Sequence, residues 1–225
     1  NHFDILVSDD GSTRDEREKL SLLCSKTEAR IGCPRLLSPL FVDLNTGKGG
    51  AIQRGWNTAH AYHGTLAFAD ADGSVSVEEI VRAEQAFRCD FSNAELLLGS
   101  RVKMLGRTVT RSFKRHLSGR IFATLVSELC GIPVYDTQCG LKFLRRHAWE
   151  AVTNHSITKG FAFDVELILL LLKHSMVAIE FPVDWKDIPG SKISLFRDSW
   201  RMALEVVAIR NRIGSLPKGK SWERR

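Results

Sequence analysis

The sequence predicts an α/β fold, in which a mostly parallel sheet carries helices on both of its faces. Short apolar runs, polar loops and amphipathic stretches alternate at least three times along the first half of the chain, and strands joined by helices favour a parallel arrangement. The composition, 44% hydrophobic and 26% charged residues, excludes a disordered, collagen-like or disulfide-stapled chain. The length of 225 residues suits one large α/β domain, or at most two small ones.

The elements of the first half follow from the apolar runs and from the residues that stop them. Each predicted strand is a short apolar run that ends in polar residues. The last helix of this half begins with acidic residues, which suit the positive end of a helix dipole. The predicted strands are 3–8, 36–43, 65–69 and 95–99, and the predicted helices are 14–23, 51–63 and 77–89.

The second half is richer in helix-like patterns. Its predicted helices are 111–129, 163–173 and 199–212, and 177–183 resembles a strand. We expect one main domain over residues 1–195, followed by an amphipathic helix and a basic tail over 196–225.

Basic residues outnumber acidic ones, with 32 Lys and Arg against 26 Asp and Glu and a net charge of +6. This excess suits a phosphate-bearing partner or a membrane surface without requiring either, and we expect no nucleic-acid partner. No apolar stretch approaches the ~18 residues that a membrane-spanning helix needs. The five scattered cysteines form no CxxC pair and favour a reduced, cytosolic compartment.

Charged side chains follow the predicted strands at the points where those strands end. In an open α/β sheet the ligand site lies beyond the carboxyl ends of the strands, so these side chains should converge on one edge. The residues are Asp9, Asp10, Lys48, Asp70, Asp72 and Arg101.

The sharpest pattern is the pair Asp70 and Asp72, which follows a short apolar strand. Mg²⁺ or Mn²⁺ is commonly held by one or two carboxylates together with the oxygens of a diphosphate. The sequence therefore predicts a divalent metal site at this loop. The alternative is an ordinary turn, since Asp and Gly favour turns.

Two other loops admit either a ligand or a structural explanation. Asp9 and Asp10 could accept hydrogen bonds from the edge of a base, or could cap the helix that follows them, and both can hold together. Lys48 lies among glycines at the start of a helix, which suits an anionic ligand. The spacing is not that of a P-loop, so we expect no nucleoside-triphosphate hydrolysis, and a plain loop is the alternative.

Taken in order, the motifs resemble those of the family 2 glycosyltransferases with the GT-A fold. The similar region covers about residues 3–212 and reads DDGST, NTGKGGA, FADADGS, GSR, DTQCGLKF, FAFDVEL and WKDIPGSK. Within this family, the sequence is similar to the branch that contains the dolichyl-phosphate β-glucosyltransferases and the polyprenyl-phosphate mannosyltransferases. The DTQCGLKF and IPGSK segments resemble those of the glucosyltransferases in particular. The QxxRW motif of processive polysaccharide synthases is absent from the sequence.

The resemblance implies roles for individual residues on the donor side. Asp9 and Asp10 would lie at the nucleotide base, and Lys48 would lie near the nucleotide. Asp70 and Asp72 would face the metal ion and the diphosphate.

The resemblance also implies roles beside the sugar and the acceptor. Asp136 and Gln138 would lie beside the transferred sugar. Phosphate of the donor or the acceptor would be held by Arg101, Arg115 and Ser118, and Lys192 would close over the acceptor phosphate. The implied catalytic residues are Asp72, Asp136, Gln138 and Lys192.

The implied activity is one inverting displacement with Mg²⁺ or Mn²⁺ as cofactor. An oxygen of a polyprenyl (dolichyl-type) phosphate attacks the anomeric carbon of a UDP-sugar, with UDP-glucose as the leading expectation. No general base is required, because a phosphomonoester has a second pKa of about 6 and is already anionic near pH 7.

Three alternative functions remain open from the sequence. The first is a GDP-mannose-dependent transferase that uses the same lipid phosphate. The second is a soluble transferase that acts on a hydroxyl group, with Asp136 or Asp164 as its base. The third is a truncated, inactive module that binds a nucleotide sugar.

The family begins with a strand that ends in a Pro-Ala-Tyr-Asn-Glu-like segment, followed by a helix, and neither is found ahead of Phe3. We expect a peripheral position at the cytoplasmic face of a membrane, with any transmembrane segment outside these 225 residues. The helices predicted over 111–129 and 199–212 are candidates to face the lipid. For 199–212, packing on the protein core is the alternative.

Overall fold

The computed structural model describes residues 3–31, 35–110, 124, 126–188 and 195–216, with the backbone alone for residues 31 and 195–201. The chain divides into two compact units. Asn1–Ala61 with Thr158–Phe161 form the N-terminal unit, and Tyr62–Ile157 with Ala162–Arg225 form the sheet unit.

The N-terminal unit contains two helices, α1 (Arg14–Ile31) and α2 (Lys48–Thr58). A capping interaction starts α1, because Glu16 Oε2 accepts hydrogen bonds from the backbone N–H of Thr13 at 3.1 Å and from its hydroxyl at 3.0 Å. The segments predicted as strands 3–8 and 36–43 run parallel to one another, but isolated bridges at Ile5–Leu36 and Ser8–Leu40 join them in place of a continuous ladder.

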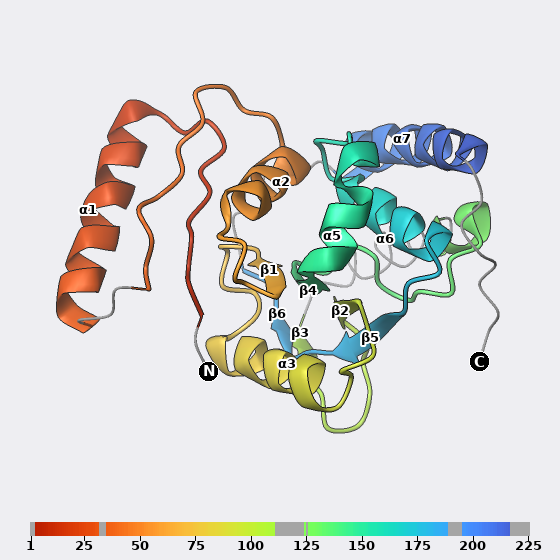
Figure 1. Ribbon diagram of the computed structural model, residues 1–225, viewed down its shortest axis with the longest axis horizontal. Helices are drawn as coiled ribbons and strands as arrows, with labels where there is room; N and C mark the ends of the chain where they lie inside the picture. The colour runs from red at the N-terminus through yellow and green to blue at the C-terminus, as the bar shows by residue number, and fades with distance from the viewer. Residues whose placement is uncertain (1–2, 32–34, 111–123, 125, 189–194, 217–225) are drawn as a thin grey trace. The chain divides into compact units, whose positions relative to one another are not determined.

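Four strands form the main sheet of the second unit. Their order is β1 (Thr65–Ala69), β4 (Leu141–Arg145), β2 (Leu96–Ser100) and β5 (Ala178–Pro182). Figure 1 shows α3 (Val77–Cys89) on one side of these strands, and α6 (Phe163–Lys173) and α7 (Leu195–Ser215) on the other. The bounds of β1, α3 and α6 are those predicted from the sequence.

The sheet is mixed, which corrects the expectation of a mostly parallel arrangement. β4 is antiparallel to both of its neighbours, β1 and β2, and only the pairing of β2 with β5 is parallel. β1, β2 and β5 therefore point the same way, and β4 is inserted in the reverse direction. Hydrophobic runs predict strands but not their direction, and β4 is not preceded by the strand–helix alternation that would fix it.

Apolar burial explains the long hydrophobic runs of the sheet unit. Leu96, Leu97 and Leu98 of β2 are fully buried, as expected for a strand that has a partner on both edges and helices on both faces. α6 buries most of its side chains because it contacts β5 and also α7. Since full burial of one leucine contributes about 2 kcal/mol, β2 and α6 form a firm support for the loops at the end of the sheet.

Several short elements were not predicted. β3 (Val109–Thr110) pairs in parallel with β6 (Trp185–Lys186). α5 (Arg146–Val152) follows β4 directly and continues into the short 3₁₀ helix η1 (Thr153–His155). These segments are too short for hydrophobic periodicity to indicate them.

The structure describes the two helices that were expected to face the lipid to different extents. The helix predicted over 111–129 lies largely outside the described residues. Residue 124 and residues 126–130 are described there, and they are helical. α7 is longer than predicted, contacts α6 and buries Val206, Ile209 and Ile213, so its buried face covers the core. α7 belongs to the sheet unit, and the division expected at residue 195 stays a prediction. Among the described residues, no helix combines the length and hydropathy needed to span a bilayer.

Candidate functional site

Three loops of the sheet unit meet at one edge of the sheet. β1 and β2 run in the same direction, and the segments after them begin with Asp70 and Arg101. β4 runs in the opposite direction, so its first residue lies opposite the last residue of β1. The reversed strand thereby brings the preceding segment 136–140, with the sequence DTQCG, to the edge where Asp70 and Arg101 leave the sheet.

Arg101 and Asp136 form a bidentate ion pair at this edge. Arg101 Nε donates to Asp136 Oδ2 at 2.6 Å, and Nη2 donates to Oδ1 at 2.8 Å. The backbone N–H of Arg101 adds a third bond to Oδ2 at 3.0 Å. The guanidinium carbon lies 5.5 Å from the centre of the Trp185 ring, within reach of a cation–π contact. Both charges are therefore held in fixed orientations.

The ion pair sets the protonation of its members. Burial by itself would raise the pKa of Asp136, but the charge and the hydrogen bonds of Arg101 outweigh burial and hold this pKa at about 2. Burial by itself would lower the pKa of Arg101, yet Asp136 raises it above its usual range, with smaller contributions from Cys139 and Asp70. Asp136 is thus an ionised and very weak base near neutral pH.

The thiol of Cys139 lies in the same segment and is fully buried. Burial, followed by the charge of Asp136, raises the pKa of this thiol to about 11. A nucleophilic cysteine needs the thiolate form, so Cys139 is a packing residue here. This agrees with the sequence, which offered no base beside it.

Glu180 on β5 anchors the beginning of the DTQCG segment. Its Oε1 accepts hydrogen bonds from the backbone N–H of Asp136 at 2.9 Å and from Ser100 Oγ at 3.0 Å. Its Oε2 accepts a hydrogen bond from the backbone N–H of Tyr135 at 2.8 Å. One carboxylate therefore ties the segment to two neighbouring strands of the sheet.

Asp70 rests directly on the end of the same segment. Its backbone N–H donates to the carbonyl oxygen of Gly140 at 2.8 Å. A Cβ atom added to Gly140 would lie 2.1 Å from Asp70 Oδ2 and 2.4 Å from Asp70 Cγ. Only glycine leaves room for the carboxylate in this position, so Gly140 is part of the site.

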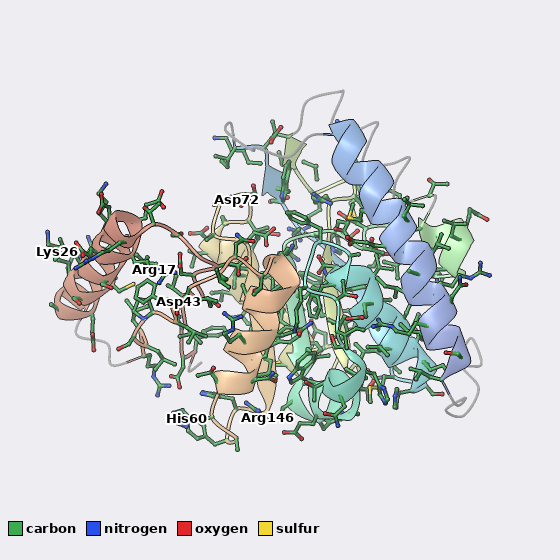
Figure 2. All side chains as sticks on the ribbon, turned by 90° about the horizontal axis from the view of Figure 1, so that it is seen from above. Arg17, Lys26, Asp43, His60, Asp72 and Arg146 are labelled. Carbon is green, nitrogen blue, oxygen red and sulfur yellow. The ribbon has the colours of Figure 1, made fainter. Side chains whose placement is uncertain are left out.

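Asp72 lies two residues further along the loop and is exposed, as is Asp70; Figure 2 labels Asp72 on this loop. Asp72 Oδ1 accepts a hydrogen bond from the backbone N–H of Ser74 at 2.9 Å. Two exposed carboxylates supply the hard oxygen donors that Mg²⁺ and Mn²⁺ prefer. No cluster of three or more His, Cys, Asp or Glu suited to a metal ion occurs in the described part of the chain. The donor set thus fits an ion that takes further oxygens from a diphosphate.

Two polar atoms of the DTQCG segment have no hydrogen-bond partner among the described residues. Thr137 Oγ1 and Gln138 Nε2 are buried and make no hydrogen bond with any described residue. A buried polar group without a partner costs about 1–3 kcal/mol. The DTQCG segment therefore keeps hydrogen-bonding capacity that none of the described residues uses.

Asp10 in the N-terminal unit organises the loop that leads into α2. Its Oδ1 accepts hydrogen bonds from the backbone N–H and the hydroxyl of Thr46, at 2.8 and 2.9 Å. Its Oδ2 accepts a hydrogen bond from the backbone N–H of Gly47 at 2.7 Å. The carboxylate thus shapes the loop that carries Lys48, a structural role beside the nucleotide contact expected from the resemblance, which stays a prediction.

Asp9 and the glycines of the α2 loop also have structural partners within their unit. Asp9 Oδ1 accepts a hydrogen bond from the backbone N–H of Ser12 at 3.1 Å, a bond within the loop ahead of α1. The backbone N–H of Gly50 donates to the carbonyl oxygen of Lys159 at 3.0 Å, and a Cβ on Gly47 would lie 2.7 Å from that oxygen. Close packing against Lys159 therefore accounts for Gly47, whereas an anion bound near Lys48 stays a prediction.

The structure places the predicted site residues in three groups. Asp70, Asp72, Arg101, Asp136 and Gln138 lie on the loops at one edge of the sheet unit. Asp9, Asp10 and Lys48 belong to the N-terminal unit. Arg115, Ser118 and Lys192 lie outside the described residues.

Sequence reasoning missed two residues that shape the site, Lys142 and Glu180. Lys142 is fully buried in β4, and its Nζ donates to the carbonyl oxygens of Thr137 and Cys139 at 3.1 and 2.9 Å. Both residues are charged side chains inside apolar strands, LKFLR and AIEFP. A charge within an otherwise apolar strand is the signal that could have revealed them, because such groups are seldom buried without a partner.

Curated relatives support the resemblance over most of the chain. The chain is 30% identical over 218 residues to the dolichyl-phosphate β-glucosyltransferase of Saccharomyces cerevisiae, covering 92% of this chain and 64% of the relative. It is 31% identical over 215 residues to the enzyme of the same name from Dictyostelium discoideum, covering 93% of this chain and 63% of the relative. The chain thus spans slightly less than two thirds of the length of these relatives. No protein-family model matches the chain.

Solved structures support the fold. Glucosyl-3-phosphoglycerate synthase from Mycobacterium tuberculosis, solved with Mn²⁺, UDP-glucose and phosphoglyceric acid, superposes with a TM-score of 0.57 and 15% sequence identity. The match covers 94% of this chain and 69% of the synthase. The resemblance indicated by the motifs is therefore confirmed: this chain is similar over most of its length to dolichyl-phosphate β-glucosyltransferases and has the GT-A glycosyltransferase fold.

Proposed function

We propose that this protein is a glycosyltransferase that moves glucose from UDP-glucose to a dolichyl-type polyprenyl phosphate and inverts the anomeric carbon. The similarity to dolichyl-phosphate β-glucosyltransferases supports the sugar, the acceptor and the β configuration. The UDP-glucose complex of a synthase with the same fold supports the donor. In the reaction, an acceptor phosphate oxygen bonds to the anomeric carbon as its bond to UDP breaks.

The choice of a phosphate acceptor rests on Asp136 and Asp164, the two carboxylates that could act as a general base, because neither is suited to that role. Asp136 has a pKa of about 2 and is bound through both oxygens by Arg101. Asp164 is fully buried, with its Oδ1 2.7 Å from Lys142 Nζ. A hydroxyl acceptor requires a base of suitable pKa within reach of its proton. A phosphate acceptor is already anionic, so the site favours a lipid phosphate over a sugar or protein hydroxyl.

The remaining need is control of negative charge, since donor and acceptor are both anions. Asp70 and Asp72 would hold Mg²⁺ or Mn²⁺, which when bound stabilises the charge that develops on the departing diphosphate. Arg101 keeps a permanent positive charge, and Asp136 fixes its orientation, so it is preorganised toward a phosphate group. Lys192, Arg115 and Ser118 are proposed as further contacts of the acceptor phosphate.

Donor recognition is proposed to use the DTQCG segment. Thr137 and Gln138 would form hydrogen bonds with sugar hydroxyls, because Thr137 Oγ1 and Gln138 Nε2 are buried without partners among the described residues. Asp9 and Asp10 would lie near the base, and Lys48 near the nucleotide. A site with buried polar groups rejects ligands that leave those groups unpaired, which gives the segment a role in choosing the sugar.

The location follows from the proposed acceptor. A polyprenyl phosphate resides in a membrane, so we propose that the protein works peripherally at the cytoplasmic face. Its net charge of +6 supports contact with anionic headgroups, which attract each nearby Lys or Arg by about 1 kcal/mol.

A donor-competition assay tests the proposal. The full-length protein is incubated with dolichyl phosphate, Mn²⁺ and radiolabelled UDP-glucose or GDP-mannose, and the lipid product is extracted and its anomeric configuration determined by NMR. We expect transfer from UDP-glucose alone and a β-linked product.

Each alternative predicts a different result in this assay. Transfer from GDP-mannose in place of UDP-glucose would establish the mannosyl alternative. Glucosylation of a soluble hydroxyl acceptor, with dolichyl phosphate inert, would contradict the phosphate acceptor. Binding of UDP-glucose without any transfer would indicate an inactive binding module.

A further inference from the structure

Lys142 and Asp164 form a charge pair in the interior of the sheet unit. Both side chains are 0% exposed, and Lys142 Nζ lies 2.7 Å from Asp164 Oδ1. The same Nζ donates to the carbonyl oxygens of Thr137 and Cys139 at 3.1 and 2.9 Å. An ammonium group has three N–H bonds; two of them donate to these carbonyl oxygens, and Asp164 interacts with the ammonium group through its charge.

Burying two charges is costly, and a buried pair often contributes less to stability than an apolar pair of similar volume. The neighbouring buried positions of β4 are occupied by leucine and phenylalanine. Packing alone would therefore allow an apolar residue at position 142. The pair therefore calls for an explanation other than stability. The two carbonyl contacts of Lys142 supply one, since no apolar side chain could make them.

The contacted carbonyls flank Gln138 in the segment that forms the candidate site. Asp136, at one end of this segment, is bound by Arg101, and Gly140, at the other end, supports the carboxylate of Asp70. Lys142 is also close enough to Asp136 for its charge to help lower the pKa of that carboxylate. The ammonium group thus fixes the middle of a segment whose two ends orient an arginine and a proposed metal ligand.

We infer that Lys142 is a positioning residue of the transfer reaction, and that Asp164 on α6 keeps its ammonium group in place. The inference rests on the proposed function for its kinetic part. Lys142 touches neither donor nor acceptor in this proposal. It acts through the peptide groups on either side of Gln138, which set where the Gln138 side chain and the Arg101–Asp136 pair meet the donor.

The test separates positioning from stability with a paired replacement in the full-length protein. Lys142→Met alone removes the ammonium group beside the buried Asp164 carboxylate and should be strongly destabilising. The double variant Lys142→Met/Asp164→Val replaces the pair by apolar side chains and should regain an unfolding midpoint close to that of the wild type. We expect its kcat/KM for UDP-glucose to stay about 100-fold below the wild-type value, because small misplacements of positioning groups have effects of this size.

Hydrogen exchange provides a readout that does not depend on activity. The backbone N–H of Gln138 donates to Asp136 Oδ1 at 3.2 Å, so exchange of a peptide over 136–141 reports on the order of the segment. We expect about 10-fold faster exchange there in the double variant, with peptides from α3 unchanged. If the wild type shows no glucosyl transfer, the proposed function fails, while the exchange result still decides whether Lys142 orders the segment.

Asp164→Asn serves as a second variant should the double variant fail to fold. It removes the charge but leaves Lys142 able to donate to both carbonyls, so turnover should fall less than in Lys142→Met. As a matched control, Glu166→Gln alters another fully buried carboxylate of α6, which is paired with Arg212, and should lower stability without changing KM or the exchange over 136–141. Wild-type kinetics and wild-type exchange in the double variant would overturn the inference.

Discussion

The two units use their carboxylates in different ways. In the N-terminal unit, Asp9 and Asp10 accept hydrogen bonds from backbone N–H groups of nearby loops. In the sheet unit, Asp136 is bound to a mostly buried cation and two other carboxylates, Asp70 and Asp72, are exposed. The first arrangement gives loops their shape. The arrangement in the sheet unit pairs Asp136 with Arg101 and leaves the carboxylates of Asp70 and Asp72 exposed at the same edge.

This difference separates stability from activity. Substitution of a carboxylate that holds backbone should mainly affect folding, whereas substitution of an exposed carboxylate at the sheet edge should mainly affect chemistry. We therefore expect two closely similar motifs, DDGS and DADGS, to serve different purposes. The predictions below test this contrast, beginning with the largest effect.

Asp72→Asn should nearly abolish transfer and leave the fold intact. Loss of a metal-binding carboxylate removes several kcal/mol of transition-state stabilisation, which is on the order of 1,000-fold in kcat. The asparagine Oδ1 can still accept the hydrogen bond from Ser74, so the unfolding midpoint should not change. Steady-state kinetics and urea unfolding check both parts, and a variant with undiminished turnover would contradict the assignment of Asp72 to the metal.

Gly140→Ala should lower turnover by about 100-fold. The new Cβ would lie 2.1 Å from Asp70 Oδ2 and 2.8 Å from Asp70 Cβ, so the loop that carries Asp70 has to shift and the proposed metal ligand is displaced. Gly11→Ala is the matched variant in the N-terminal unit. Gly11 has φ of +84°, and its Cβ would lie 2.6 Å from the backbone nitrogen of Asn45, so we expect a loss of about 2 kcal/mol or more in stability. Undiminished turnover in Gly140→Ala, or unchanged stability in Gly11→Ala, would contradict the roles given to the two glycines.

Asp10→Ala should destabilise the N-terminal unit by about 2–3 kcal/mol, because hydrogen bonds to a charged acceptor contribute more than neutral ones. Asp43→Asn is its control. Figure 2 labels Asp43 and its partner Arg17, which lie 3.2 Å apart, and the Asp43 side chain is fully exposed, so its loss should have almost no effect. Urea unfolding of both variants measures the difference, and comparable stability of the two would refute the role given to Asp10.

The Asp136 ion pair should make the sheet unit sensitive to acid. The folded pKa of Asp136, about 2, lies below its ordinary value of 3.8. The carboxylate therefore contributes stability above about pH 4 that is lost as pH falls toward 2. The linkage amounts to about 2 kcal/mol. Unfolding free energies between pH 5 and 2 should show this loss in the wild type and a smaller one in Asp136→Asn, and identical pH dependences would contradict the assignment.

The sequence predicted most of the elements and several members of the site. β1, α3 and α6 have the predicted bounds because their apolar runs and caps are strong local signals. The motifs also pointed to Asp70, Asp72, Arg101 and Asp136, which the structure places on loops at one edge of the sheet; their roles stay predictions. The motifs did not reveal Gly140 as the support of Asp70, or the buried contacts of Lys142 and Glu180, because these involve residues distant in the sequence or backbone atoms that leave no trace in the pattern.

Local chemistry alone thus determined the α/β class, the acidic and basic loops after the strands, and the likeness to glucosyltransferases. The direction of β4 was decided by tertiary structure, and with it the position of the DTQCG segment at the edge shared by Asp70 and Arg101. Strand direction depends on which partners bury the strand, and a hydrophobic run is the same read from either end. The low pKa of Asp136 likewise depends on an arginine 35 residues away, which only the folded chain brings within hydrogen-bonding distance.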